Sequence, residues 1–177
     1  KRINEDYMKK GVTLVDPSSA FINYGTQIGE DSVIYPFTVI ERDVKIGKRC
    51  KVGPFAHLRP GTELQDDVGV GNFIELVRTK ISSKSKAKHF GYIGDTQIGR
   101  FVNIGAGTVT ANYDGKSKNK TVIQDHAFIG SDTVIVAPVR IGKRAATGAG
   151  SVVVKNRNVS NGTVVAGVPA RFIKKRG

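Results

Sequence analysis

Aliphatic side chains recur at every sixth position along the first half of the chain. A small or β-branched residue follows the first nine of them four positions later, and glycine often follows directly. The period breaks after residue 76, returns at residue 98, and returns with a shifted phase at residue 123. The first run comprises Ile22, Ile28, Ile34, Ile40, Ile46, Val52, Leu58, Leu64, Val70 and Leu76.

Helices and antiparallel strands have shorter repeats, and neither gives a period of six. A parallel β-helix does, because each six-residue unit forms one flat face and one corner. Three faces close a triangular coil, so equivalent residues recur about every 18 positions and the aliphatic side chains stack inward, about 4.8 Å apart. The pattern therefore predicts an all-β parallel β-helix of roughly seven coils between about residues 20 and 155.

Two lysine-rich segments interrupt the period. One runs from Ile81 to Ile93 and contains KAKHFGYIGD, and the other is ANYDGKSKNKT, residues 111–121. Insertions in a solenoid become loops on one side of the coil, often the functional side. We therefore expect both segments to be such loops, with His89 on the first.

The two ends depart from the repeat. Asn4 can cap a short helix that has acidic residues in its first turn, lysines in its last turn and Gly11 as the residue after its end. The chain therefore divides into a linker helix over 1–11, a β-helix over 12–155 and a basic cap or tail over 156–177. We expect that tail to cover the open end of the coil.

Composition narrows the class of protein. The formal net charge is +13, which favours acidic partners such as phosphorylated small molecules, nucleic acid or an anionic membrane. No apolar run is long enough for a membrane span, and the N-terminal residues do not resemble a signal peptide. The single cysteine, Cys50, falls in a small-residue position of the repeat, which indicates a structural role in a reducing compartment.

Several strings carry a resemblance to a known family. The chain resembles the acetyltransferase half of the bacterial bifunctional N-acetylglucosamine-1-phosphate uridylyltransferases / glucosamine-1-phosphate N-acetyltransferases, which are hexapeptide-repeat acyltransferases. The matching strings are RINEDYMKKGVTLVDP, GPFAHLRPGTEL, VGNFIEL, KAKHFGYIGD, VNIGAGTVTANYDG, FIGSDTVIVAPV and GAGS.

The resemblance implies a left-handed coil, a cytoplasmic homotrimer, and acetyl transfer from acetyl-CoA to glucosamine 1-phosphate without a metal. It implies no nucleic-acid or membrane partner. His89 matches the catalytic base, a role suited to imidazole near neutral pH. Glu75 matches a residue that orients the imidazole, and Ser131 matches a residue near the thioester carbonyl, where an oxyanion donor is needed.

The same resemblance assigns binding residues. The residues matched to the amino-sugar substrate are Arg59 and Tyr92, which hold its phosphate in the family, and Asn103 and Asn112. The residues matched to acetyl-CoA are Ala106, Asn112, Tyr113, Lys118, Ser131 and Ala149, and Arg171 is a substitute for a C-terminal arginine of the family. Taken singly, Asn103 and Asn112 also suit left-handed corner turns, and Arg59 suits a solvated corner.

Three departures from the family pattern bear on the substrate. A phosphate-binding lysine is replaced by Val77, and the C-terminal arginine by Ala166 or Gly167. Losing one charge-assisted hydrogen bond to phosphate costs about 1.5–3 kcal/mol. The chain also lacks a uridylyltransferase domain, so we expect no uridylyl transfer.

Three other functions compete with this prediction. A different amino sugar is one alternative, because of Val77. A zinc site built from His57, His89 and His126 is a second, although their spacing does not suit the coil repeat. A non-catalytic trimeric binding module is a third, although the scarcity of aromatic residues disfavours nucleic acid.

Overall fold

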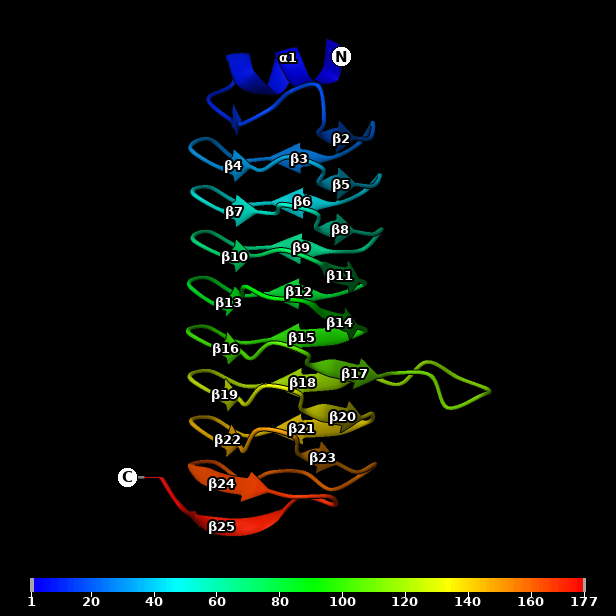
Figure 1. Cartoon of the computed structure of the whole chain (residues 1–177), viewed down its shortest axis with the longest axis vertical. Coiled ribbons are helices and arrows are strands. Elements are labelled where there is room, and N and C mark those ends of the chain that lie inside the picture. Colours follow the sequence, from blue (N-terminus) through cyan, green and yellow to red (C-terminus); the bar gives the residue numbers. More distant parts are fainter. Residues whose placement is uncertain (1, 177) are drawn as a thin grey trace.

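Each six-residue unit of the sequence forms a short strand in the computed structural model, which describes residues 2–176. Most of these strands have two residues, and the second is the aliphatic residue of the repeat. The parallel β-helix predicted from the period is therefore confirmed. Figure 1 shows the coils stacked along one long axis, with the helix at one end and the last strands at the other.

The strands form three sheets, which we name face A, face B and face C. Face A contains β1 (Thr13–Leu14), β4 (Val33–Ile34), β7 (Lys51–Val52), β10 (Gly69–Val70), β13 (Lys86–Ala87), β16 (Asn103–Ile104), β19 (Phe128–Ile129), β22 (Ala146–Thr147), β24 (Thr163–Ala166) and β25 (Arg171–Lys175). Face B contains β2 (Phe21–Ile22), β5 (Val39–Ile40), β8 (His57–Leu58), β11 (Ile74–Val77), β14 (Gly91–Gly94), β17 (Val109–Ala111), β20 (Val134–Val136) and β23 (Val152–Val153). Face C contains β3 (Gln27–Ile28), β6 (Lys45–Ile46), β9 (Glu63–Leu64), β12 (Lys80–Ile81), β15 (Thr96–Ile98), β18 (Thr121–Ile123) and β21 (Val139–Ile141).

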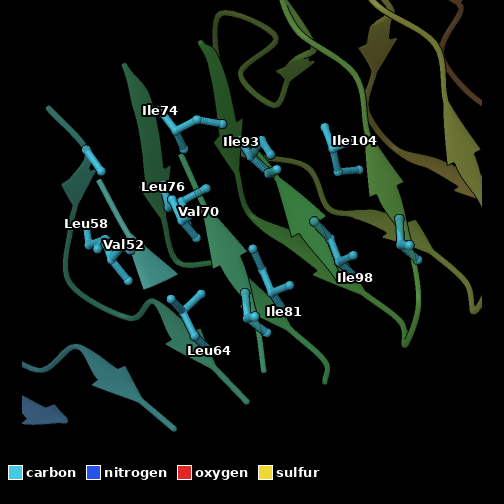
Figure 2. Packing of buried hydrophobic residues seen from close by; sticks show 14 of the residues in the cluster. Val52, Leu58, Leu64, Val70, Ile74, Leu76, Ile81, Ile93, Ile98 and Ile104 are labelled. Atoms are coloured by element: carbon cyan, nitrogen blue, oxygen red, sulfur yellow. The ribbon is translucent and has the colours of Figure 1, made fainter. Parts of the chain in front are cut away.

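The aliphatic residues of all three faces point inward and form one continuous core. Figure 2 shows this stacking for residues of several successive coils, among them Val52, Leu58, Leu64 and Val70. Cys50 is fully buried in the small-residue position, and burial raises the pKa of its thiol. The structural role predicted for Cys50 is therefore confirmed.

The segment from Ile81 to Ile93 is not an inserted loop, so that prediction is wrong. It forms β12, β13 and β14, and its aliphatic residues Ile81, Ala87 and Ile93 belong to the core. The coil instead loses one residue at the corner after Leu76 and again at the corner after Ile93. A shortened corner shifts the phase of the repeat as an insertion does, so the sequence pattern alone does not distinguish the two.

Helix α1 (Arg2–Lys9) begins two residues before the predicted cap. Asn4 lies inside the helix, where its amide donates hydrogen bonds to the carbonyl oxygens of Pro17 and Ala20 on the first coil. The capping role predicted for Asn4 is therefore wrong, because the side chain ties the helix to the coil. The predicted end is confirmed, since Gly11 has a φ of 83° and follows the last turn. No helix within residues 2–176 has the length and apolar character needed to cross a bilayer.

Parallel pairing continues beyond residue 155, because β24 pairs with β22 on face A. The chain then reverses, and β25 pairs with β24 in the antiparallel sense. The coils number about eight, slightly more than expected, since face B alone holds eight strands. The division into helix, coil and tail at residues 11 and 155 stays a prediction.

Candidate functional site

Four of the predicted site residues form a column along the corner between faces A and B. The strands β13, β16, β19 and β22 are paired in register, and each is followed two residues later by a member of the column. The members, in order along the coil axis, are His89, Ala106, Ser131 and Ala149. Adjacent coils lie about 4.8 Å apart, so the coil places these groups at fixed intervals despite their wide separation in the sequence.

The corner that carries His89 differs from its neighbours. The residue after the column position has a left-handed φ on adjacent coils, such as 55° at Phe73 and 72° at Gly107, whereas Phe90 lacks one. This corner also presses against the coil on each side. A Cβ at Gly71 would lie 1.7 Å from the carbonyl oxygen of Lys88, and one at Gly91 would lie 2.7 Å from that of Thr108.

His89 is therefore held on a distorted corner that only glycine neighbours accommodate. Its side chain is exposed. Within residues 2–176 its imidazole makes no side-chain hydrogen bond, so the ring is available to a ligand. This is the arrangement that a base acting on a bound substrate requires.

The acidic residue predicted to orient His89 contacts a different side chain. Glu75 lies on β11 of face B, where its Oε1 accepts a hydrogen bond from Arg59 Nη1 at 2.8 Å. Arg59 Nε also lies 4.0 Å from Glu41 Oε1, which in turn lies 2.7 Å from His57 Nε2. The orienting role of Glu75 stays a prediction, and the structure joins this residue to Arg59 rather than to His89.

A second chain of contacts runs along the corner between faces B and C. Arg78 donates to both carboxylate oxygens of Asp95, at 2.6 and 2.8 Å. Asn112 donates to the same carboxylate and lies 3.4 Å from the hydroxyl oxygen of Tyr92. Hydrogen bonds from Arg78, and then from Asn112, lower the pKa of Asp95. Val77 is only 3% exposed, so it offers no group to a ligand here.

Sequence reasoning gave Asp95 no role, although it ends the string KAKHFGYIGD. Three consecutive coils supply Arg78, Asp95 and Asn112, and the shortened corners bring them into line. The loss of one residue at each of these corners is the signal in the sequence that aligns the three residues. Asp95 thereby connects two predicted substrate contacts, Asn112 and Tyr92.

The second lysine-rich segment is a projecting loop, as predicted. Residues 112–120 leave the coil after β17 and extend outward as an arm (Figure 1). Asp114 organises the arm, because it accepts hydrogen bonds from the backbone of Lys116 and Ser117, from the Asn119 amide and from Lys155. These contacts, with the Ser117 backbone foremost, lower the pKa of Asp114. Tyr113 and Lys118 are exposed on the arm.

The remaining predicted residues lie elsewhere on one chain. Asn103 points outward from face A, and Arg171 lies on β25 at the end of that face. Neither Asn103 nor Asn112 has a left-handed φ, so the corner-turn alternative does not describe them. The three histidines are dispersed: His57 is on face B, His89 at the corner of faces A and B, and His126 at the corner of faces C and A, stacked on Phe101.

Comparison with known proteins identifies the class of protein to which this coil belongs. A family model described as bacterial transferase hexapeptide (six repeats) matches residues 25–60 and 120–155. The chain belongs to the hexapeptide-repeat transferases. Within that class it is homologous to part of the bifunctional GlmU proteins. It is 44% identical to the protein of Thermosipho africanus over 189 residues, and 43% identical to that of Thermotoga maritima over 185 residues.

These alignments cover 88% and 86% of the chain but 42% of each relative, so the chain spans about two-fifths of their length. Solved structures support the fold. The polysialic acid O-acetyltransferase OatWY superposes with a TM-score of 0.54 at 19% identity, covering 93% of this chain and 88% of that one. A UDP-N-acetylglucosamine acyltransferase of Francisella novicida gives 0.51 at 16% identity, covering 89% and 69%.

Proposed function

We propose that the chain is an acetyl-CoA-dependent N-acetyltransferase that converts glucosamine 1-phosphate into N-acetylglucosamine 1-phosphate. The homology to GlmU proteins supports the reaction class. The observation that carries the proposal is the column at the corner of faces A and B, where the exposed His89 precedes Ala106, Ser131 and Ala149.

The reaction follows from the chemistry of the column. Only the neutral amine has a lone pair with which to attack, and His89 takes one proton from this nitrogen as it attacks the thioester carbon. The C–N bond forms, and negative charge develops on the carbonyl oxygen near Ser131, where a polar donor stabilises it. The C–S bond then breaks, and the departing thiolate takes up the proton held by His89. No metal takes part.

Acetyl-CoA acts as a substrate that lies along the later part of the column. In this proposal Ala106, Ser131 and Ala149 border its thioester arm. The arm residues Tyr113 and Lys118, together with Asn112 and Arg171, supply further contacts.

The acceptor contacts in this proposal are Arg59, Tyr92, Asn103 and Asn112, with Glu75 holding Arg59. These residues lie on different faces of one chain, so a neighbouring subunit would complete the site. We therefore propose that the chain assembles as a homotrimer. A cytoplasmic location is part of the same proposal.

Acetyl transfer by the purified chain tests the reaction. We expect His89→Ala to lower kcat at least about a hundredfold, because general-base catalysis contributes on that order. The matched control is His126→Ala, an exposed histidine at a different corner of the coil, which should leave kcat within about twofold. Turnover that survives in His89→Ala would contradict the role of His89.

A different amino sugar remains the second candidate, because Val77 is buried where the family carries a lysine. A panel of amino sugars with and without a 1-phosphate separates the two. A preference for unphosphorylated sugars would favour the second candidate.

A further inference from the structure

The positive charge of the chain is concentrated on its last coils. Residues 133–177 contain nine of the 28 Lys and Arg residues and none of the 15 Asp and Glu residues. They therefore carry most of the net charge of +13. All nine side chains are exposed, and they are Arg140, Lys143, Arg144, Lys155, Arg157, Arg171, Lys174, Lys175 and Arg176.

These basic residues surround the coil rather than follow one side of it. Arg140 is the outward residue of β21 on face C, and Lys143 and Arg144 follow it at the corner of faces C and A. Lys155 and Arg157 follow β23 at the corner of faces B and C, and the other four lie on β25 or directly after it. Of the nine, only Lys155 lies within 4.0 Å of a carboxylate in residues 2–176. The remaining charges are therefore not neutralised within this part of the chain.

Apolar side chains are exposed among these charges at the end of the coil. β25 is the outermost strand of face A, and all five of its residues are exposed (Figure 1). Phe172 and Ile173 on this strand are 60% and 56% exposed, and Val168 shortly before it is 71% exposed. Apolar groups gathered on a surface and bordered by polar ones mark a site of interaction.

The proposed acetyl-CoA site does not account for this surface. That site follows the corner of faces A and B, whereas Arg140, Lys143 and Arg144 lie on face C and at its corner with face A. Only Arg171 belongs to both. Lysines on an outermost strand also discourage edge-to-edge pairing between molecules, but that role does not extend to face C.

The mixture of basic and aliphatic groups indicates which partner fits. A nucleic acid would neutralise the basic residues through its phosphates, but Ile173 and Val168 have no aromatic ring with which to stack on bases. An anionic bilayer accommodates both kinds of group. Its headgroups attract Lys and Arg, and apolar side chains enter the boundary between the headgroups and the acyl chains.

We propose that the end of the coil, formed by β25 and the basic residues around it, docks on the surface of an anionic lipid bilayer. Val168, Phe172 and Ile173 enter the headgroup boundary, and the basic residues contact the headgroups. The resemblance implied no membrane partner, and this surface departs from that expectation. His89 lies several coils away from β25, so docking leaves the proposed active site open. The inference goes beyond the proposed function and does not depend on it.

Co-sedimentation of the whole chain with lipid vesicles tests the proposal. We expect binding to vesicles of phosphatidylglycerol and phosphatidylcholine in equal proportion, and none to vesicles of phosphatidylcholine alone. Binding should weaken as salt is raised, because salt screens the attraction between basic residues and headgroups. Lys174→Gln/Lys175→Gln should lower the partition coefficient about tenfold or more. The charge-matched control is Lys9→Gln/Lys45→Gln, which removes two exposed lysines from α1 and face C and should change it less than about twofold.

The apolar residues are tested by a variant of their own. We expect Phe172→Ser/Ile173→Ser to lower the partition coefficient about tenfold or more and to leave its salt dependence unchanged, because the variant removes apolar area and no charge. Val15→Ser/Phe21→Ser removes two exposed apolar side chains near the other end of the coil and should bind as the wild type does. Acetyl transfer in solution should stay within about twofold of wild type in all four variants. A failure of docking is thereby distinguished from a failure of the proposed reaction.

Other outcomes would overturn the proposal. Equal binding to both kinds of vesicle, or to neither, would remove the role of anionic lipid. Displacement from vesicles by CoA would assign the basic residues to acetyl-CoA. Binding to single-stranded RNA that exceeds vesicle binding and survives in Phe172→Ser/Ile173→Ser would assign the surface to nucleic acid. A lower assembly mass of that variant in sedimentation would show that a second copy of the chain covers β25.

Discussion

Asp95 illustrates how a single residue can join parts of a site that sequence reasoning treats separately. Its carboxylate holds Arg78 of the preceding coil and Asn112 of the following one, and its side chain is only 11% exposed. Asn112 in turn lies against Tyr92. Asp95 thus positions two predicted substrate contacts without being one itself.

This arrangement gives stability a defined pH dependence. The contacts lower the pKa of Asp95 below that of a free aspartate, so its stabilising contribution is present above about pH 4 and is lost as pH falls through the folded-state pKa. We expect Asp95→Asn to lower the unfolding free energy at pH 7 by about 1–3 kcal/mol, and by less near pH 3. Urea unfolding at both pH values and one protein concentration measures this difference.

Asp6→Asn, which changes an exposed carboxylate of α1, is the control and should have little effect at either pH. An equal loss of stability in Asp95→Asn at pH 7 and pH 3 would show that the charge of the carboxylate does not matter.

At the scale of elements, the arm at 112–120 and the coil corners were predicted with unequal success. The arm was recognisable because Asn-Tyr-Asp-Gly and several lysines replace the repeat, and those residues cannot fill an aliphatic core. The corners after Leu76 and Ile93 were misread because a deletion and an insertion produce the same phase shift. Only the pairing of β12, β13 and β14 with neighbouring coils distinguishes the two.

The arm depends on one carboxylate, and this leads to a prediction. Asp114 accepts four hydrogen bonds that hold the arm in its turn, including one from Lys155 on the coil. We expect Asp114→Ala to raise KM for acetyl-CoA about fivefold to tenfold and to make the arm sensitive to trypsin at its lysines. The melting temperature should change little, because the arm contributes nothing to the core.

Asp16→Ala removes a different exposed aspartate turn on the first coil and is the control for the arm variant. If Asp114→Ala leaves both the tryptic pattern and KM unchanged, the arm does not need that carboxylate.

At the scale of the molecule, the period was sufficient to predict the fold because almost every aliphatic anchor lies inside the coil. The site was harder to predict. Its residue types followed from the resemblance, but their distribution over the A–B corner, face A, face B and the arm depends on the register of the strands. Charge balance between faces depends on which side chains pair across coils, and composition alone cannot show that.

The dispersal of the predicted residues leads to a prediction about assembly. We expect sedimentation to give three times the chain mass of 19.1 kDa. We also expect that unfolding and refolding a mixture of inactive His89→Ala and weakly active Lys118→Ala chains restores activity above that of either alone. Restoration follows because mixed trimers contain sites in which one subunit supplies His89 and its neighbour supplies Lys118. A monomeric mass in sedimentation, or no recovery of activity in the mixture, would indicate that His89 and Lys118 act within one chain.

The column at the corner of faces A and B fixes the spacing of its side chains along the coil axis. Backbone hydrogen bonds between coils set the spacing between adjacent positions of the column, which is about 4.8 Å. Sequence changes that preserve the coil can move His89 relative to Ser131 only by whole coils. Changes within one coil leave the spacing between coils unchanged. Substitutions can therefore alter the side chain at any one position of the column without disturbing the distance over which the base and the thioester must meet.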